Sequence, residues 1–196
     1  KSYPYPSFEV RDLHTVDQGV QRHMVPEIRG ESFGKKGWHL ILGHMLGVDH
    51  VGHRLGSNHP EMALKLAEMN LVIGQVMNAI ETGEEKDDNT LFVVMSDHGM
   101  NYEGNHGGAT FQETSASLFF FTPKQRAFAN PITTPLPNPA NPHTYASVSQ
   151  IDIVPTISML LGAPIPFGSL GMIIPELFWD SNNPSELLDP LHVNSA

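Results

Sequence analysis

The longest regular pattern of apolar and polar residues lies in the middle of the chain, between residues 60 and 80. Apolar side chains recur there every three to four positions, which is the period of an amphipathic helix. They are Met62, Leu66, Met69, Ile73, Val76, Met77 and Ile80. Pro60 suits the first turn of a helix, and Thr82-Gly83 marks its end. The pattern therefore predicts a helix over 60–80, with Glu68 on the face opposite the apolar stripe.

Two continuous apolar runs flank this predicted helix, at residues 38–43 and 91–95. Such runs are typical of strands that are buried on both faces of a sheet. A strand, a helix and a second strand at this spacing predict a right-handed crossover between parallel strands. Residues 115–122 predict a further strand. We therefore expect an α/β fold in which a mainly parallel sheet is flanked by helices.

Weaker patterns complete the predicted organisation, which is one domain over residues 1–196. A helix is expected over 17–26 with Asp17 as N-cap, and another over 153–161 with Asp152 as cap. Residues 145–148 predict a short edge strand. Residues 123–143 are rich in Pro, Asn and Thr and predict a long surface loop, and residues 181–196 predict a polar tail.

Composition and charge exclude several classes of protein. The 196 residues are enough for one domain with a sizeable core. A formal net charge of −10 argues against a nucleic-acid partner, which requires a basic surface. The absence of cysteine excludes disulfides and thiolate metal sites. Because the sequence contains no apolar run of membrane length, any membrane association is expected to come from segments outside this chain.

Carboxylates and imidazoles gather where the two predicted central strands end. Asp49 and His53 follow the first strand, Asp97 and His98 follow the second, and His106 lies on the glycine-rich stretch after them. Parallel strands bring their carboxyl ends to one edge of a sheet, where ligands bind. Oxygen and imidazole donors suit zinc or manganese, and two such ions clamp a phosphoryl group. The alternative is a polar loop with a capping aspartate and solvated histidines.

The motifs around these residues resemble those of the alkaline phosphatase superfamily. They read Gly47-Val-Asp-His-Val-Gly-His53, Asn58-His-Pro-Glu-Met62, Ser96-Asp-His-Gly-Met100 and His106-Gly-Gly108. Within the superfamily they are most similar to the luminal catalytic domain of GPI ethanolamine phosphate transferases. Residues 6–17 and 165–171 extend the likeness to both ends of the chain and favour the third transferase of that pathway.

This resemblance implies a ligand set and a biological setting. Asp49, His53 and His106 would hold one divalent metal ion, and Asp97 and His98 would hold a second, with zinc expected and manganese as the alternative. The enzyme would move phosphoethanolamine from phosphatidylethanolamine to a mannose of the GPI glycolipid. It would act in the endoplasmic reticulum membrane with its catalytic domain in the lumen, and the resemblance leaves room for a small membrane partner subunit.

The resemblance also implies residues that the chain does not show. The family has an earlier strand that ends in a metal-binding Asp, followed by a Thr or Ser nucleophile, and we expect both upstream of Lys1. The chain would then be the C-terminal portion of a catalytic domain and inactive by itself. Thr110, Thr114 and Ser115 lie near the metal loop, but they do not match the family's nucleophile, so structural hydrogen bonding is expected of them.

Two other functions remain open on the sequence. The first is another member of the superfamily, such as a nucleotide phosphodiesterase or a cofactor-independent phosphoglycerate mutase. The sulfatase branch is disfavoured, because it uses calcium and a modified Cys or Ser. The second is a metal-binding module without catalytic activity.

Overall fold

Helix α3 (Pro60–Thr82) is the longest element of the structure and confirms the helix predicted there. Its start is capped by His59, whose Nδ1 accepts a hydrogen bond from the backbone N–H of Glu61 at 3.2 Å. The buried face differs in part from the predicted stripe, because Leu66 is half exposed and Lys65 is buried. The buried residues of α3 are Met62, Lys65, Met69, Val72, Val76, Ala79 and Ile80.

The computed structural model describes residues 1–31, 38–82, 90–123 and 147–178. Within the chain two compact units form, Lys1–Pro123 and Lys124–Ala196. The predicted tail at 181–196, all but the first residue of the predicted loop at 123–143, and half of the predicted edge strand at 145–148 lie outside the described residues. Residues 147 and 148 belong to no strand.

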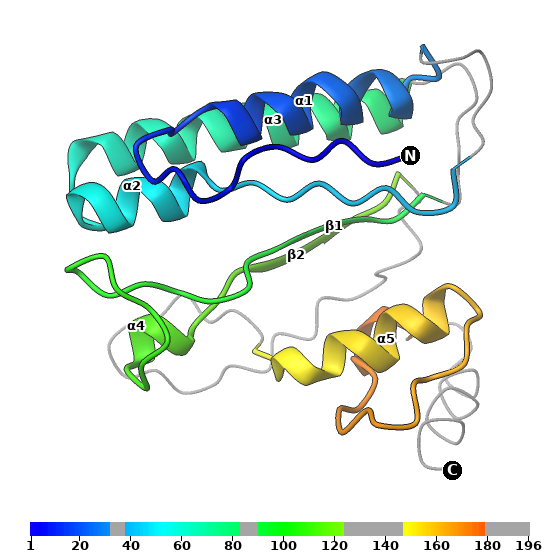
Figure 1. Cartoon of the computed structure of the whole chain (residues 1–196). Helices are drawn as coiled ribbons and strands as arrows, with labels where there is room; N and C mark the ends of the chain where they lie inside the picture. The colour runs from blue at the N-terminus through cyan, green and yellow to red at the C-terminus, as the bar shows by residue number, and fades with distance from the viewer. Residues whose placement is uncertain (32–37, 83–89, 124–146, 179–196) are drawn as a thin grey trace. The chain divides into compact units, whose positions relative to one another are not determined.

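The first unit combines helices with a small sheet (Figure 1). Helices α1 (Thr15–Ile28) and α3 run side by side, and the short α2 (Gly47–Leu55) packs against α3. The main core joins the ends of α1 and α3 to the sheet. Its members are Val25, Ile28, Val76, Ala79 and Ile80, with Met24, Trp38, Ile41, Phe92 and Phe121 packed against them.

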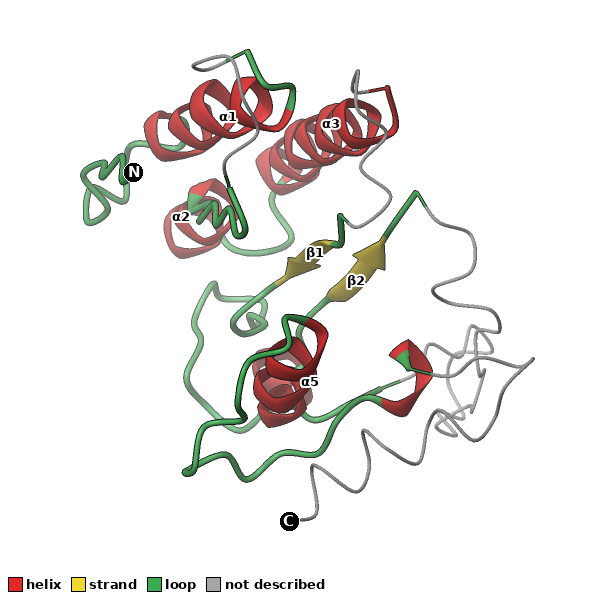
Figure 2. Cartoon of the chain, turned by 90° about the vertical axis from the view of Figure 1, so that its right-hand side faces the viewer, coloured by secondary structure: helices red, strands yellow, loops and turns green. Residues whose placement is uncertain are grey.

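The sheet does not confirm the prediction of parallel strands. Strand β1 (Phe92–Met95) pairs with β2 (Leu118–Phe121) in an antiparallel register that places Phe92 opposite Phe121 (Figure 2). The predicted strand at 38–43 belongs to no sheet in the described chain. Two side chains of this apolar run, Trp38 and Ile41, pack against the core. A continuous apolar run does not by itself show whether its backbone has a partner.

The start of α1 also differs from the prediction, because Asp17 is not its N-cap. The helix begins at Thr15, and the Asp12 carboxylate accepts hydrogen bonds from the backbone N–H groups of Thr15 at 2.9 Å and His14 at 3.0 Å. These hydrogen bonds, the one from Thr15 foremost, lower the pKa of Asp12 to about 2. Asp17 instead lies buried in the first turn of α1, and its carboxylate interacts with a neighbouring helix.

A capping box begins the short helix α4 (Phe111–Thr114). The Thr110 hydroxyl accepts from the Glu113 N–H at 3.3 Å and donates to Glu113 Oε2 at 2.5 Å. This bond from the Thr110 side chain is the main reason why the pKa of Glu113 is lowered. Thr114 donates to the Thr110 carbonyl, and the Ser115 N–H donates to the Phe111 carbonyl. The structural roles expected of these hydroxyl residues are therefore confirmed for Thr110 and Thr114.

In the second unit, the predicted helix is present as a 3₁₀ turn η1 (Gln150–Asp152) followed by α5 (Ile153–Leu160), with a second turn η2 (Pro175–Leu177) after them. Asp152 forms a capping box with Ser149 rather than capping α5 with its side chain. Leu160 and Leu161 are 39% and 56% exposed, and the buried residues of α5 are Pro155 and Thr156.

Among the residues that the structure describes, we find no helix that combines the length and the apolar character needed to cross a bilayer.

Candidate metal centre

Helix α2 supplies two of the predicted ligands from one face. Asp49 and His53 are four residues apart, so their side chains lie one above the other on the helix. The His53 Nε2 atom is 3.3 Å from Asp49 Oδ1. Both side chains are about one-third exposed, which leaves them accessible to a ligand from solvent.

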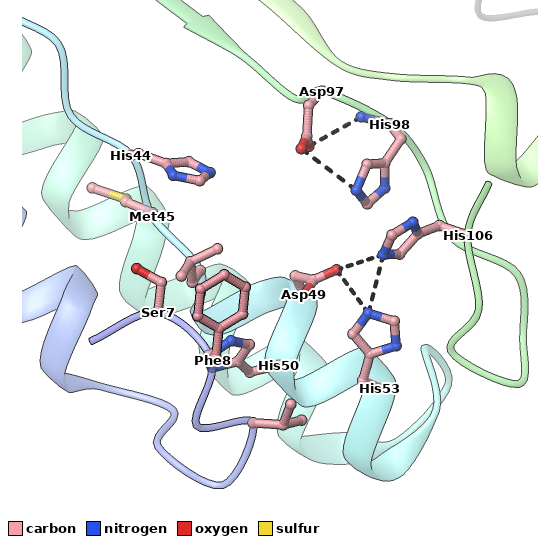
Figure 3. Close-up of a pocket in the computed structure, with 12 residues that line it drawn as sticks. Ser7, Phe8, His44, Met45, Asp49, His50, His53, Asp97, His98 and His106 are labelled. Atoms are coloured by element: carbon pink, nitrogen blue, oxygen red, sulfur yellow. Dashed lines mark hydrogen bonds and ion pairs between the residues drawn. The ribbon is translucent and has the colours of Figure 1, made fainter. Parts of the chain in front are cut away.

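His106 joins this pair from the loop that follows β1. Its Nε2 atom is 3.1 Å from His53 Nε2 and 3.5 Å from Asp49 Oδ1, so three donor atoms converge (Figure 3). Zinc bonds of about 2.0 Å in a tetrahedral arrangement separate neighbouring ligand atoms by about 3.3 Å. The spacing of the three donors therefore matches the spacing that one zinc ion requires.

The Asp49 carboxylate provides an independent test of this fit. Its Oδ1 atom is buried and, among the described residues, receives no hydrogen bond. A buried carboxylate oxygen without a hydrogen bond is costly, because that oxygen has lost its own contact with water. A cation held between this oxygen and the two imidazoles would remove that cost.

Asp97 and His98 lie beside the three converging ligands. His98 Nδ1 is 3.0 Å from the Gly99 carbonyl, which can only accept, so Nδ1 carries the proton and Nε2 keeps its lone pair. That Nε2 is 3.5 Å from Asp97 Oδ2. The His98 ring also stacks on His106 with centroids 3.8 Å apart, and Asp49, His98 and His106 offer ligand atoms within 4.8 Å of one another. His98 therefore lies near the first ligand set as well as near Asp97.

A contact between two glycines brings the His106 loop onto α2. Gly104 is buried with φ +83°, and a Cβ atom there would collide with the carbonyl of Gly52, next to His53. The same loop is anchored by a hydrogen bond from the Ser57 N–H to the Tyr102 carbonyl at 3.3 Å. Because no side chain separates the two backbones, His106 can reach the face of α2 that carries Asp49 and His53.

Replacing Gly104 by alanine is expected to lower the free energy of unfolding by about 2 kcal/mol or more and to weaken metal binding. The new methyl group both strains the backbone and pushes the loop away from α2. Gly107→Ala is the matched control, since Gly107 has φ +88° but open space around a Cβ. Its free energy of unfolding is expected to fall by only about 1 kcal/mol, which is the backbone strain of a side chain at this φ. Equal losses in chemical denaturation would show that the glycine contact contributes nothing.

The ligands line a pocket of about 350 Å³ in the first unit. Seven further residues line this pocket and were not singled out from the sequence, namely Ser7, Phe8, Val10, His44, Met45, Leu46 and His50. Ser7 and Phe8 lie in the stretch 6–17 that extends the family likeness, so a signal existed for them. His50 is buried, and its Nδ1 lies 2.8 Å from the Asp12 carbonyl. No sequence pattern distinguishes His44 from a histidine at the end of any strand.

Comparison with known families shows to which family these motifs belong. The family model described as type I phosphodiesterase / nucleotide pyrophosphatase matches residues 3–116, which include every predicted metal ligand. The chain belongs to this family. It is a phosphodiesterase-type member of the alkaline phosphatase superfamily, as the motifs predicted.

Individual relatives of this phosphodiesterase-family chain are GPI ethanolamine phosphate transferases. Transferase 3 of Mus musculus is 39% identical over 202 residues, which cover 100% of this chain and 17% of that protein. Transferase 3 of Schizosaccharomyces pombe is 42% identical over 178 residues, or 91% and 17%. Transferase 2 of Aspergillus oryzae is 42% identical over 176 residues, or 89% and 20%. The predicted resemblance is therefore confirmed.

The chain spans about a fifth or less of the length of these curated relatives. No solved structure matches it.

Proposed function

We propose that the chain is part of the catalytic domain of a GPI ethanolamine phosphate transferase. Support comes from relatives at about 40% identity over nearly the whole chain and from the donor atoms that converge around Asp49. Both units would then belong to one alkaline-phosphatase-like domain. In the full-length protein, phosphatidylethanolamine would be the donor and the GPI glycolipid the acceptor.

The proposed ligands divide between two divalent ions. Asp49, His53 and His106 hold the first, and Asp97 with His98 contributes to the second, which needs further ligands. Zinc suits the nitrogen and carboxylate donors best, with manganese as the alternative. A bound divalent ion would act as a Lewis acid toward a phosphoryl oxygen and would lower the pKa of an attacking hydroxyl. The observation that carries this proposal is the spacing of 3.1–3.5 Å among the donor atoms.

Residues around the proposed ligands affect which nitrogen donors and which hydroxyl groups are available at this site. The Gly99 carbonyl fixes the tautomer of His98, so that its Nε2 lone pair is available. His44 lines the same pocket and adds an imidazole donor beside the ligands. The hydroxyls of Thr110 and Thr114 are held in the cap of α4, which argues against either as the nucleophile. We therefore place the nucleophile in a segment of the full-length protein outside this chain.

The biological setting follows from the same relatives. The mammalian relatives are described as catalytic subunits, which favours a partner subunit in the membrane. We place the enzyme in the endoplasmic reticulum membrane with this domain in the lumen. Membrane anchoring would come from other segments of the full-length protein.

Transfer activity of a full-length protein that contains this chain tests the proposal. In microsomes, His106→Ala is expected to reduce transfer of phosphoethanolamine to the GPI glycolipid to background, because it removes one of three ligands of the first ion. His39→Ala removes an exposed histidine that does not line the pocket and is expected to retain activity. Normal transfer by His106→Ala would reject the assignment of the metal centre.

A second candidate function is that of a phosphodiesterase, in which water accepts the phosphoryl group of the substrate. The family model that covers residues 3–116 favours it, since that model describes hydrolytic enzymes. The two functions differ in the acceptor. Release of free phosphoethanolamine at the expense of the glycolipid product would favour the hydrolase.

A further inference from the structure

The direction of the Asp49 carboxylate depends on where α2 begins. Asp49 is the third residue of this helix, and each residue of a helix advances the side-chain direction by about 100°. A rotation of α2 about its axis by the equivalent of one residue would therefore turn Asp49 and His53 together away from His106. The first N–H groups of a helix need acceptors, yet the N-cap Leu46 makes no side-chain cap.

Asp17 supplies the missing acceptor from another helix. Its Oδ1 atom accepts from the backbone N–H groups of Leu46 at 2.8 Å and Gly47 at 3.1 Å. Asp17 lies in the first turn of α1 and is only 2% exposed. A carboxylate at the start of a helix also interacts favourably with the helix dipole. Asp17 thus does for α2 what a capping residue does for its own helix.

Lys65 holds the Asp17 carboxylate in place. Its ammonium group is 1% exposed and donates to Asp17 Oδ2 at 3.4 Å, to Glu68 Oε2 at 2.8 Å and to His14 Nδ1 at 2.9 Å. An ammonium group has three N–H donors, so each one has an acceptor. Buried ion pairs add little stability compared with apolar residues of the same volume. Such ion pairs instead fix the relative orientation of the groups that they join, because all hydrogen bonds of the network are made in only one arrangement of these groups.

The three helices meet at Gly47, two residues before Asp49. A Cβ atom at this position would collide with Asp17 Oδ2, would lie 2.7 Å from the Leu13 carbonyl and 2.9 Å from Lys65 Cδ. The start of α2 is therefore pressed against the buried pair with no space for a side chain. Neither Asp17 nor Lys65 lines the pocket, so neither contacts a ligand there.

We propose that Asp17, held by Lys65, is a positioning residue that fixes the start of α2 and thereby the direction of the Asp49 carboxylate in the metal centre. This inference rests on the proposed function, since it requires a metal ion at Asp49. The buried network acts only through the geometry of α2. Loss of the network therefore weakens metal binding beyond what its effect on stability explains.

Two double variants test the role of the pair. Asp17→Leu with Lys65→Met removes the acceptor and the charge together, whereas Asp17→Asn with Lys65→Met keeps an acceptor oxygen. Zinc affinity of the 196-residue chain is expected to fall about tenfold or more in the first variant, the range seen for groups that orient ligands. The second variant is expected to recover most of that affinity. Cobalt(II) absorption, which reports ligand geometry, is expected to change only in the first.

Val76→Ala is the control for stability, because Val76 is buried in the core between α1 and α3 and is not a pocket residue. It is expected to lower the melting temperature but to bind zinc as the unchanged chain does. Wild-type affinity and an unchanged cobalt spectrum in the Leu/Met variant would overturn the inference, as would an equal loss in Val76→Ala. If the unchanged chain itself bound no zinc, the proposed metal centre would be wrong and this inference with it.

Discussion

Asp49→Ala is expected to weaken zinc binding by the isolated chain at least about 100-fold, since groups that only orient ligands already contribute ten- to hundredfold. Asp49 Oδ1 is a buried oxygen that lies 3.3 Å from His53 Nε2 and 3.5 Å from His106 Nε2. Its removal leaves two imidazoles without a counter-charge. Calorimetry on metal-free protein should therefore show one tightly bound equivalent fewer than in the unchanged chain.

Glu103→Ala separates the loss of a ligand from the loss of charge. Glu103 is an exposed acid on the loop that carries His106. Its replacement changes the net charge by the same amount, but removes none of the converging donor atoms. Zinc affinity should stay within about twofold of the unchanged chain, because exposed charges are screened by solvent and salt. If the two variants lost affinity equally, zinc would be held by the general negative charge of the chain and not by this centre.

Met69→Asp is expected to destabilise the first unit by about 3 kcal/mol or more, which is a large share of the roughly 5–15 kcal/mol that stabilises an ordinary domain. Met69 is 8% exposed on the inner face of α3, so an aspartate there would bury a charge without a partner. Leu71→Asp introduces the same residue at a position of the same helix that is 69% exposed. It should change the free energy of unfolding by only about 0.5 kcal/mol.

Urea denaturation followed by circular dichroism distinguishes the two variants of α3. The midpoint should fall steeply for Met69→Asp and stay almost constant for Leu71→Asp. Similar midpoints would mean that the inner face of α3 is assigned wrongly. Glu68 is unsuitable as an exposed control, although the sequence placed it opposite the apolar stripe, because it accepts a hydrogen bond from the buried Lys65.

Local patterns identified the parts of the structure that depend on local chemistry. The period of three to four residues located α3, since apolar residues at that period are typical of a helix with one buried face. The Asp-His pairs identified donor atoms that lie close together, because donors four residues apart on a helix or adjacent on a loop stay together in any fold. His106 required more, namely a loop that approaches α2 at Gly104, and the glycine-rich sequence supplied only a hint of it.

Long-range partners were beyond the reach of the same patterns. The apolar runs at 38–43 and 91–95 look alike in sequence, yet within the described part of the chain only the second has a neighbouring strand, and that strand is antiparallel. Lys65 interrupts an apolar face and would ordinarily be assigned to the surface. Its burial depends on Asp17, which is 48 residues away. Nothing near Asp17 in the sequence indicates that it caps a helix other than its own.

The close contact of Gly104 with Gly52 has a thermodynamic consequence for a metal-binding chain. Many small zinc domains order their backbone only when the ion arrives, so that binding free energy is converted into folding free energy. Here backbone packing and the Ser57–Tyr102 hydrogen bond already bring the imidazoles within 3.1 Å of each other. An ion that bound at the proposed centre would therefore have no loop to order and little apolar surface to bury on entry. Its full coordination energy would remain for affinity, and ions could be exchanged while the chain stays folded.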